Sequence, residues 1–230
     1  QKDLIKMEHT IKQIYSQITS CNDCPRLVSW REEIAQKKRK SFIEWDYWGK
    51  PVPGYGDPKS GLLILGLAPA AHGGNRTGRV FTGDKSADFL FKCMYAAGLS
   101  NQSNSDSMDD GLQLKGYMTV AVKCVPPGDK PTAEERNNCA KHLSSEIKFL
   151  PNLKIVVGLG KIGFESFLHY TRNNYELKMK DYPFKHGVGY TLPSGITLYG
   201  AYHPSPRNVN TKRITFDMMV AFLKQLKNEI

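Results

Sequence analysis

The sequence contains no long apolar stretch and few cysteines, and each shortage excludes a class of protein. No apolar run approaches the roughly 20 residues that a bilayer-spanning helix needs, and the first ten residues lack the basic-then-apolar order of a secretory signal. We therefore expect a soluble, intracellular protein. Five cysteines in 230 residues are too few and too unevenly placed for a small disulfide framework. A reducing cytoplasm would favour metal or redox use of clustered cysteines instead.

Acidic residues are also scarce relative to basic ones. Lys and Arg number 32 against 22 Asp and Glu, which gives a formal net charge of +10. Such a surface attracts polyanions, so nucleic acid is the first partner to consider, although charge alone equally fits a basic protein without a nucleic-acid site. The length of 230 residues and the apolar content of 40% suit one hydrophobic core, and we expect a single domain over 1–230.

Short apolar runs alternate with segments of helical apolar spacing. Strands are predicted over 62–65, 117–122, 155–157 and 197–201. Helices are predicted over 4–18, 85–97, 162–170 and 214–227, and another from a capping box at 132–135 to about residue 150. This alternation is typical of an α/β protein, a three-layer α/β/α sandwich with a mainly parallel four-stranded central sheet.

Two segments lack this periodicity. Residues 31–60 mix the basic run 37–40 with aromatic residues, prolines and glycines, and we expect irregular connecting structure there. Residues 101–111 are polar and are expected to form a mobile surface loop. In an α/β sheet, ligands bind beyond the carboxyl ends of the strands, where the chemically unusual segments of this chain fall.

A glycine-rich loop from Gly66 to Asp84 follows the first predicted strand. Its small residues let the backbone approach a ligand closely, and Arg76 and Arg79 can pair with phosphate. The loop is neither G-x-G-x-x-G nor a Walker loop, which disfavours a conventional nucleotide-cofactor site. A nucleotide-handling enzyme that binds a free phosphate stays open as an alternative. Asp84 is either the N-cap of the next helix, which we favour, or a carboxylate that positions water.

A second motif, His203-Pro204-Ser205-Pro206, follows the fourth predicted strand. The two prolines stiffen the loop, so it can press into a DNA groove at little ordering cost. Donors to phosphates or base edges come after it. A structural histidine in a proline-rich turn is the alternative. The residues of this segment that we assign to DNA binding are Ser205, Arg207, Asn208, Lys212 and Arg213.

The cysteines form two separated pairs, with Cys93 apart from them. Cys21-x2-Cys24 is a close pair, whereas Cys124 and Cys139 are distant from it and from each other. Four thiolates suit a tetrahedral zinc ion or an iron–sulfur cluster, and the spacing alone leaves the two at parity. Cys93 lies on an apolar stretch of a predicted helix and is expected to be a buried core residue.

Taken together, these segments resemble the uracil-DNA glycosylase superfamily, specifically its iron–sulfur family 5, or type B. The motifs in order are Cys21-x2-Cys24, the loop Gly66 to Asp84, Lys123-Cys124-Val125-Pro126-Pro127, Cys139, and His203 to Asn208. The resemblance implies a 4Fe–4S cluster in a region built from 21–24 and 124–139. Its ligands would be Cys21, Cys24, Cys124 and Cys139.

The same resemblance implies the composition of a base pocket. Phe81 would stack on the extruded base, and His203 would sit beside the glycosidic bond. Family 4 relatives carry Glu at the position of Leu67, and other members carry Asp or Asn at that of Ala68, so the usual water-positioning side chain is absent. Val120 replaces a uracil-reading Asn, which implies that hypoxanthine and xanthine are accepted too. The predicted pocket comprises Gly66, Ala68, Ala70, Phe81 and Val120.

The resemblance thus implies a monofunctional DNA-repair glycosylase that flips deaminated bases out of DNA and leaves an abasic site. We assign His203 to donate a hydrogen bond to the departing base, and Asn75, nearby backbone or Asp84 to hold the water. His72, Arg76 and Arg79 are further candidates for DNA contacts. We expect a cytoplasmic monomer associated with the nucleoid. The alternative is a non-catalytic, metal-stapled DNA-binding module.

Overall fold

The computed structural model describes residues 2–230, with side chains from His9 onward. The first predicted helix begins at Leu4, whose side chain therefore lies outside the described part. The helices are α1 (Lys2–Thr19), α2 (Pro25–Lys37), α3 (Gly74–Thr77), α4 (Lys85–Ala96), α5 (Ala133–Lys148), α6 (Lys161–Arg172), α7 (Pro206–Asn210) and α8 (Phe216–Glu229). Single 3-10 turns occur at η1 (Lys40–Phe42), η2 (Pro127–Asp129) and η3 (Met179–Asp181). The strands are β1 (Tyr55–Gly56), β2 (Leu62–Gly66), β3 (Tyr117–Val120), β4 (Ile155–Leu159), β5 (Gly189–Thr191) and β6 (Thr197–Ala201).

The strands form one sheet in the order β1-β3-β2-β4-β6-β5. The four predicted strands are its inner, parallel part. The predicted count of four is too low, because the antiparallel strands β1 and β5 pair at the two edges. These edge strands contain only two and three residues, too few to give an apolar alternation in the sequence.

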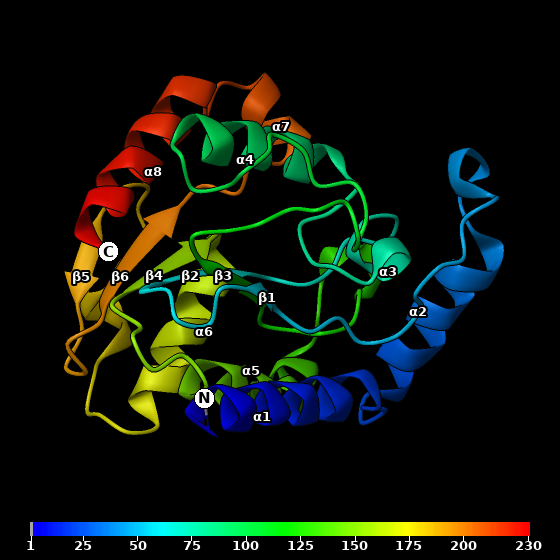
Figure 1. Ribbon diagram of the computed structural model, residues 1–230, viewed down its shortest axis with the longest axis horizontal. Coiled ribbons are helices and arrows are strands. Elements are labelled where there is room, and N and C mark those ends of the chain that lie inside the picture. Colours follow the sequence, from blue (N-terminus) through cyan, green and yellow to red (C-terminus); the bar gives the residue numbers. More distant parts are fainter. Residues whose placement is uncertain (1) are drawn as a thin grey trace.

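Helices cover both faces of the sheet, which confirms the three-layer α/β/α prediction (Figure 1). Successive side chains of a strand point to opposite faces. Accordingly Leu62 and Ile64 of β2 pack in a core with α4 and α8, whereas Leu63 and Leu65 pack in a second core with α5 and α6. Because both faces of β2 are covered, its sequence is a continuous apolar run rather than an alternation.

The interval 31–60 is only partly irregular, since α2 extends through its first seven residues to Lys37. Pro25 occupies the first turn of α2, where a missing N–H is tolerated. The buried residues of this helix are Leu27 and Arg31, so the apolar periodicity that reveals most helices is weak here. In Figure 1, α2 runs along the right-hand side of the molecule and leads into η1.

Residues 101–111 lie mostly at the surface, as predicted, but Ser105 is fully buried, and the mobility of this loop stays a prediction. Ser105 accepts a hydrogen bond from Gly83 N through its carbonyl, at 2.7 Å. The loop is therefore fastened to the glycine-rich loop that follows β2.

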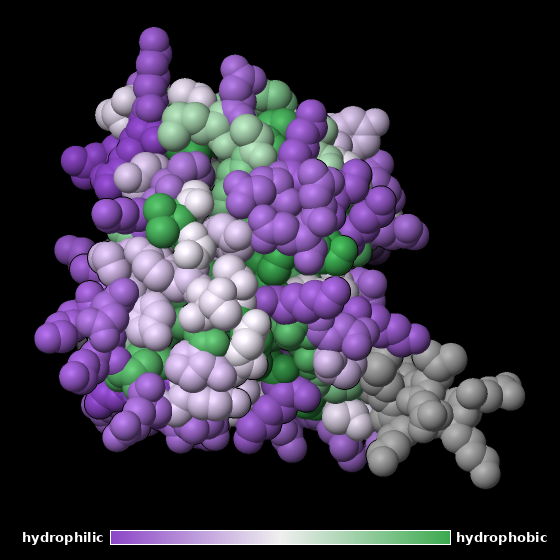
Figure 2. Space-filling model, turned by 90° about the vertical axis from the view of Figure 1, so that its left-hand side faces the viewer, coloured by the Kyte–Doolittle hydropathy of each residue, from purple (hydrophilic) through white to green (hydrophobic). Residues whose placement is uncertain are grey.

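The described helices include none that is both long and apolar enough to cross a bilayer. Figure 2 shows the face of the molecule on the β5 side, where hydrophilic and intermediate residues dominate and apolar side chains appear only in small separate spots.

Candidate active site

The parallel strands bring the predicted motifs to one edge of the sheet. Gly66 at the end of β2 pairs with Val120 at the end of β3, and Leu159 of β4 pairs with Ala201 of β6. His203 follows β6, and its Cβ lies 3.5 Å from where a Cβ on Gly160 would stand. The chain leaves β2 toward β3 but leaves β4 toward β6, so a switch in winding direction lies between β2 and β4. This is where ligands bind in open α/β sheets.

Three predicted pocket residues meet directly at this edge. A Cβ on Gly66 would lie 2.6 Å from Phe81 Cζ and 3.5 Å from Val120 Cγ1. The Phe81 ring therefore lies against the Gly66 backbone, an approach that only glycine allows. Phe81 adopts a φ of 51°, in the left-handed region that bulky residues avoid. Its aromatic face is thus presented by a strained backbone, as at many ligand sites.

The two predicted alanines lie next to this pocket. Ala68 packs against the cluster that contains Cys124 and Cys139, and so lies between the pocket and the cysteines. The Ala70 carbonyl accepts hydrogen bonds from Gly73 N and Asn75 N, at 3.3 and 3.0 Å, and closes the turn into α3. Both are half-buried and offer no polar side chain.

His203 lies at the start of a rigid loop. Its carbonyl accepts a hydrogen bond from Asn208 Nδ2 at 2.8 Å, and Ser205 Oγ caps α7 by accepting from Asn208 N. Burial lowers the pKa of the His203 imidazole below its ordinary value, and Asp129 partly opposes this shift. Since the ordinary pKa is about 6.5, His203 is neutral at pH 7 and can donate from one ring nitrogen.

Asp84 is the N-cap of α4, as favoured from the sequence. Its Oδ1 accepts hydrogen bonds from Ser86 N and Ala87 N, at 2.9 and 3.0 Å. Its Oδ2 faces Gly73, 2.5 Å from where a Cβ would stand. Burial raises the pKa of the Asp84 carboxyl, against the effect of the two backbone donors. One oxygen is thus committed to the helix, and water positioning by the other stays a prediction.

Asn75 is buried, with 1% of its surface exposed. Its Nδ2 donates to the carbonyl of Arg31 in α2, at 3.1 Å, whereas its Oδ1 has no hydrogen-bond partner among the described residues. The side chain therefore ties the glycine-rich loop to α2. Whether Oδ1 also holds a water, as the sequence led us to expect, stays a prediction.

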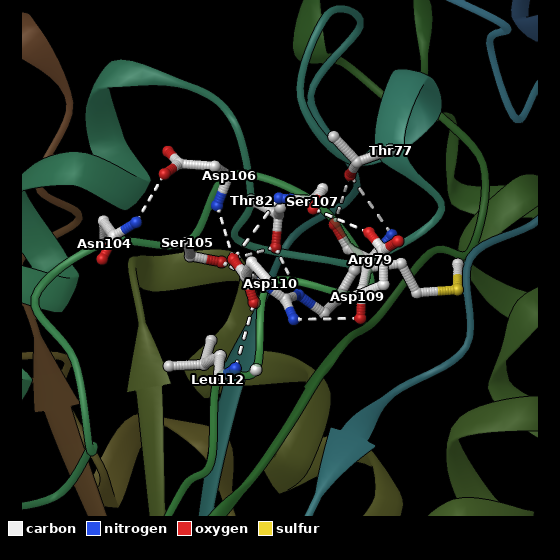
Figure 3. Close-up of polar contacts among 12 residues, drawn as sticks. Thr77, Arg79, Thr82, Asn104, Ser105, Asp106, Ser107, Asp109, Asp110 and Leu112 are labelled. Carbon is white, nitrogen blue, oxygen red and sulfur yellow. Dashed lines mark hydrogen bonds and ion pairs between the residues drawn. The ribbon is translucent and has the colours of Figure 1, made fainter.

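The two arginines of the loop are turned inward, unlike the exposed phosphate contacts expected from the sequence. Arg76 is 3% exposed and donates to the carbonyls of His72 and Gly83, at 2.7 and 2.9 Å. Arg79 is 5% exposed and pairs with Asp110 at 2.7 Å (Figure 3). Arg76 also packs against two aromatic rings and Arg79 pairs with a carboxylate, in both cases from distant segments of the chain.

The other predicted DNA contacts remain at the surface. Arg207, Lys212 and Arg213 are exposed around α7, and the Arg213 guanidinium lies 4.6 Å from the centre of the Tyr202 ring. His72 is half-buried, and its Nδ1 hydrogen-bonds to Tyr47 Oη at 2.9 Å. The basic surface near the pocket is thus formed mainly by the segment after His203.

The four cysteines predicted to bind metal line one small cavity of about 20 Å³. All five cysteines of the chain are free thiols. Within the described residues, no three His, Cys, Asp or Glu side chains are close enough together to hold a metal ion. The four thiols share the lining of this cavity. Cys93 is fully buried in the core between α4 and α8, as predicted.

Polar groups around this cavity were not anticipated from the sequence. Arg31, 3% exposed, donates to Cys124 Sγ at 3.1 Å and to the Cys21 carbonyl at 3.2 Å. Lys123 N donates to Cys139 Sγ at 3.2 Å. The one signal in the sequence was Lys123, a cation placed between Val122 and Cys124 in an otherwise apolar segment.

Lys123 also forms a buried ion pair. Its Nζ lies 2.5 Å from Glu146 Oε2, and each side chain is 1% exposed. Lys123 Nζ donates to the Val120 carbonyl at 2.8 Å, and Glu146 accepts from Gly54 N at 2.6 Å. With its hydrogen bonds satisfied, the pair fixes the segment that leads from the pocket to Cys124.

Comparison with known proteins gives consistent matches along the chain. Residues 53–227 match the family pattern of the "Uracil DNA glycosylase superfamily". A Type-5 uracil-DNA glycosylase of Thermus thermophilus is 46% identical over 211 residues, covering 91% of this chain and 94% of the relative. One from Pyrobaculum aerophilum is 43% identical, covering 91% and 89%. A Type-4 uracil-DNA glycosylase of Sulfurisphaera tokodaii is 26% identical, covering 80% and 77%.

Proposed function

The chain belongs to the uracil-DNA glycosylase superfamily, and we propose that it is a DNA-repair enzyme that hydrolyses the bond between uracil and deoxyribose and leaves an abasic site. The observation that carries this proposal is the contact of Gly66 with Phe81 and Val120 at the carboxyl end of the parallel strands, at the sheet edge where His203 also lies. The pocket offers an aromatic face for a flat base and a nearby hydrogen-bond donor.

The target nucleotide leaves the helical stack at a cost of a few kcal/mol. Phe81 receives the base on its ring. As the glycosidic bond breaks, negative charge grows on the base and positive charge on the sugar. Neutral His203 donates a hydrogen bond to the departing base, and the DNA phosphates stabilise the sugar cation. The water that attacks the sugar is held by the Asp84 Oδ2 carboxylate oxygen, by Asn75 Oδ1 or by backbone of the glycine-rich loop.

The four cysteines around the common cavity fit a 4Fe–4S cluster. Such a cluster takes one thiolate at each of several separate irons, whereas a single zinc needs four sulfurs at about 2.3 Å from one point. The thiols of Cys21, Cys24, Cys124 and Cys139 line one cavity, and the resemblance described from the sequence favours the cluster over a zinc ion. Bound there, the cluster would cross-link α2, the end of β3 and α5, and could exchange an electron.

The cluster is tested by metal and sulfide analysis of the purified protein. Iron and acid-labile sulfide in near-equal amounts, with broad visible absorption, would support it. Zinc without iron would reject it. Neither readout depends on glycosylase activity.

The range of substrates is wider in our proposal than uracil alone. Val120 is 1% exposed and brings only methyl groups to the pocket. A wall without a polar reader discriminates weakly, because rejection by 10⁴ or more requires buried polar groups that are left unpaired by the wrong ligand. Hypoxanthine and xanthine should therefore be excised as well.

The experiment is a single-turnover excision assay with excess protein and matched duplexes carrying uracil, hypoxanthine or xanthine, read as alkali-labile strand breaks. We expect breaks with uracil and with at least one purine. His203→Ala should slow excision by about 10² to 10³. Binding without a break at any lesion would leave a DNA-binding module, and uracil breaks alone would reject the broader range.

A further inference from the structure

A basic and aromatic turn follows α2, and the site described above does not include it. We call residues 37–46 the basic–aromatic turn. Lys38 ends α2 with a φ of 50°, and η1 follows at Lys40–Phe42. Phe42 N donates to the Arg39 carbonyl and Trp45 N to the Phe42 carbonyl, at 2.8 and 3.1 Å. Consecutive hydrogen-bonded turns make this segment compact and give it a defined shape.

The turn is locked to the pocket loop by Arg76. The Arg76 guanidinium carbon lies 3.9 Å from the centre of the Phe42 ring and 4.0 Å from that of Trp45. The same guanidinium donates to the Gly83 carbonyl, two residues after Phe81. Cation–π contacts strengthen when the arginine is desolvated, as Arg76 is here. The basic–aromatic turn therefore lies next to the loop that presents Phe81.

The residues that follow the turn, Tyr47 and Trp48, make further hydrogen bonds to the turn and to the glycine-rich loop. Tyr47 Oη accepts from Arg39 N at 3.3 Å and hydrogen-bonds to His72 Nδ1. Trp48 N donates to the Arg76 carbonyl at 3.0 Å. The turn is thus held from both ends against the same loop and cannot move independently of it.

The outer surface of the turn combines positive charge with apolar groups, together with the exposed carboxylates of Glu44 and Asp46. Arg39 and Lys40 are exposed, and the two cations before them are partly engaged: Lys37 pairs with Glu33, and Lys38 donates to the Ile43 carbonyl. Ile43 is 54% exposed and Trp45 is 36% exposed.

Trp45 contacts Arg76 inside the fold, whereas the side chains of Arg39 and Lys40 make no hydrogen bond or ion pair with other described residues, and Ile43 is exposed. Exposed isoleucine and tryptophan next to cations resemble the way proteins contact nucleic acid, with phosphates bound by Lys or Arg and sugars or bases covered by apolar and aromatic groups. A partner protein of this face would have to be acidic. The proposed function places DNA, which is a polyanion, at the site next to this turn, so we choose DNA as the partner.

We propose that the basic–aromatic turn is a second DNA contact, which binds the backbone beside the flipped nucleotide. Arg39 and Lys40 bind phosphates there. Ile43 covers sugar and base surface in the adjoining groove. The proposal rests on the proposed function, since it takes the position of the DNA from the pocket. Arg39 and Lys40 also provide exposed cations beside the glycine-rich loop, whose own arginines, Arg76 and Arg79, are buried.

The test measures binding to a short duplex with a tetrahydrofuran abasic-site analogue, which cannot be cleaved, between about 50 and 200 mM KCl. Arg39→Ala/Lys40→Ala should reduce the slope of log K against log salt by about two units, because each lost phosphate contact releases about one counterion fewer. The matched control is Lys59→Ala/Lys154→Ala. It removes the same charge from exposed lysines before β2 and β4, at the opposite end of the sheet.

An unchanged slope in Arg39→Ala/Lys40→Ala, or an equal fall in the control, overturns the proposal. That result leaves the proposed function intact if the wild-type protein still excises uracil. Conversely, a wild-type protein that binds the duplex but never produces an abasic site removes the enzymatic function, while a reduced slope would still support the contact.

A second variant tests the apolar part. Ile43→Ser removes exposed apolar surface without changing charge. We expect binding to weaken about tenfold with the salt slope unchanged, because apolar burial releases no counterions. Full affinity in Ile43→Ser would reject the groove contact of this residue. Far-ultraviolet circular dichroism of each variant confirms that the fold is retained.

Discussion

Arg79 and Asp110 form a buried ion pair across two loops, with Nη2 2.7 Å from Oδ2 and side chains 6% and 11% exposed. Arg79 also donates to Thr82 Oγ1 and Ser105 Oγ, at 3.0 and 2.9 Å (Figure 3). Phe81 lies between Arg79 and Thr82 in sequence and carries the left-handed φ. The network therefore holds both sides of a strained residue and supplies the interactions that offset its strain.

Loss of the Asp110 charge should weaken the network that holds Phe81 in its left-handed conformation. Asp110→Asn leaves the Arg79 cation buried without its carboxylate, and removing one partner of a buried pair costs about 3 kcal/mol. We expect a lower free energy of unfolding in urea and a slower single-turnover excision of uracil. Asp109→Asn is the control, because Asp109 is exposed and its carboxylate accepts a hydrogen bond only from Ser107 among the described residues. Equal effects in both variants would contradict the assignment.

The same carboxylate should make stability depend on pH. Burial alone would raise the pKa of Asp110, but hydrogen bonds from Arg79 and from Asp106 N and Leu112 N outweigh it and lower the pKa. A depressed pKa in the folded state means that the stabilisation is complete above the unfolded value of about 3.9 and is lost as the pH falls through the folded value. Urea unfolding at pH 5 and pH 3 should show a smaller difference in Asp110→Asn than in the wild type. Parallel curves would refute this.

Gly66→Ala should damage the pocket without unfolding the sheet. The new methyl group would lie 2.6 Å from Phe81 Cζ, too close for the ring to keep its place. We expect excision to fall by about 10-fold to 100-fold, because a misplaced substrate-binding group costs rate steeply. Gly61→Ala is the matched control at the other end of the same strand, where the nearest atom lies at 3.4 Å. Wild-type kinetics in Gly66→Ala would show that Phe81 does not need its observed position.

The inner sheet was predictable from the sequence because β2, β3, β4 and β6 are buried on both faces and are therefore written as apolar runs. Parallel pairing then placed the motifs after Gly66, Val120 and Ala201 at one edge. The capping box at Thr132 and the cap at Asp84 were likewise local signals, and both form as predicted.

What sequence could not provide was the orientation of the loop arginines. The partners of Arg76 are Phe42 and Trp45, and the partner of Arg79 is Asp110, all of them more than 25 residues away along the chain. A Gly-rich loop with two arginines gives no sign of such distant partners. Basic residues in a binding loop were therefore interpreted as ligand contacts, whereas these two build the loop.

Arg31 gives the final prediction, because it joins the cysteine cavity to the pocket loop. Its guanidinium donates to Cys124 Sγ, and its carbonyl accepts from Asn75 Nδ2. Hydrogen bonds to a metal-binding sulfur are conserved features of such sites, and their loss costs about 10-fold to 100-fold in metal affinity or activity. With the proposed cluster bound, Arg31→Gln should therefore lower the iron content of the purified protein and weaken its visible absorption.

Arg136→Gln is the matched control for Arg31→Gln. It removes the same charge from an exposed position on α5, three residues before Cys139. We expect Arg136→Gln to retain its iron and its excision rate. If Arg31→Gln also retains full iron but excises uracil slowly, the residue acts through Asn75 alone, and the link to the cysteines is rejected. If iron falls while the protein that keeps its cluster remains fully active, the two sites are stabilised by Arg31 independently.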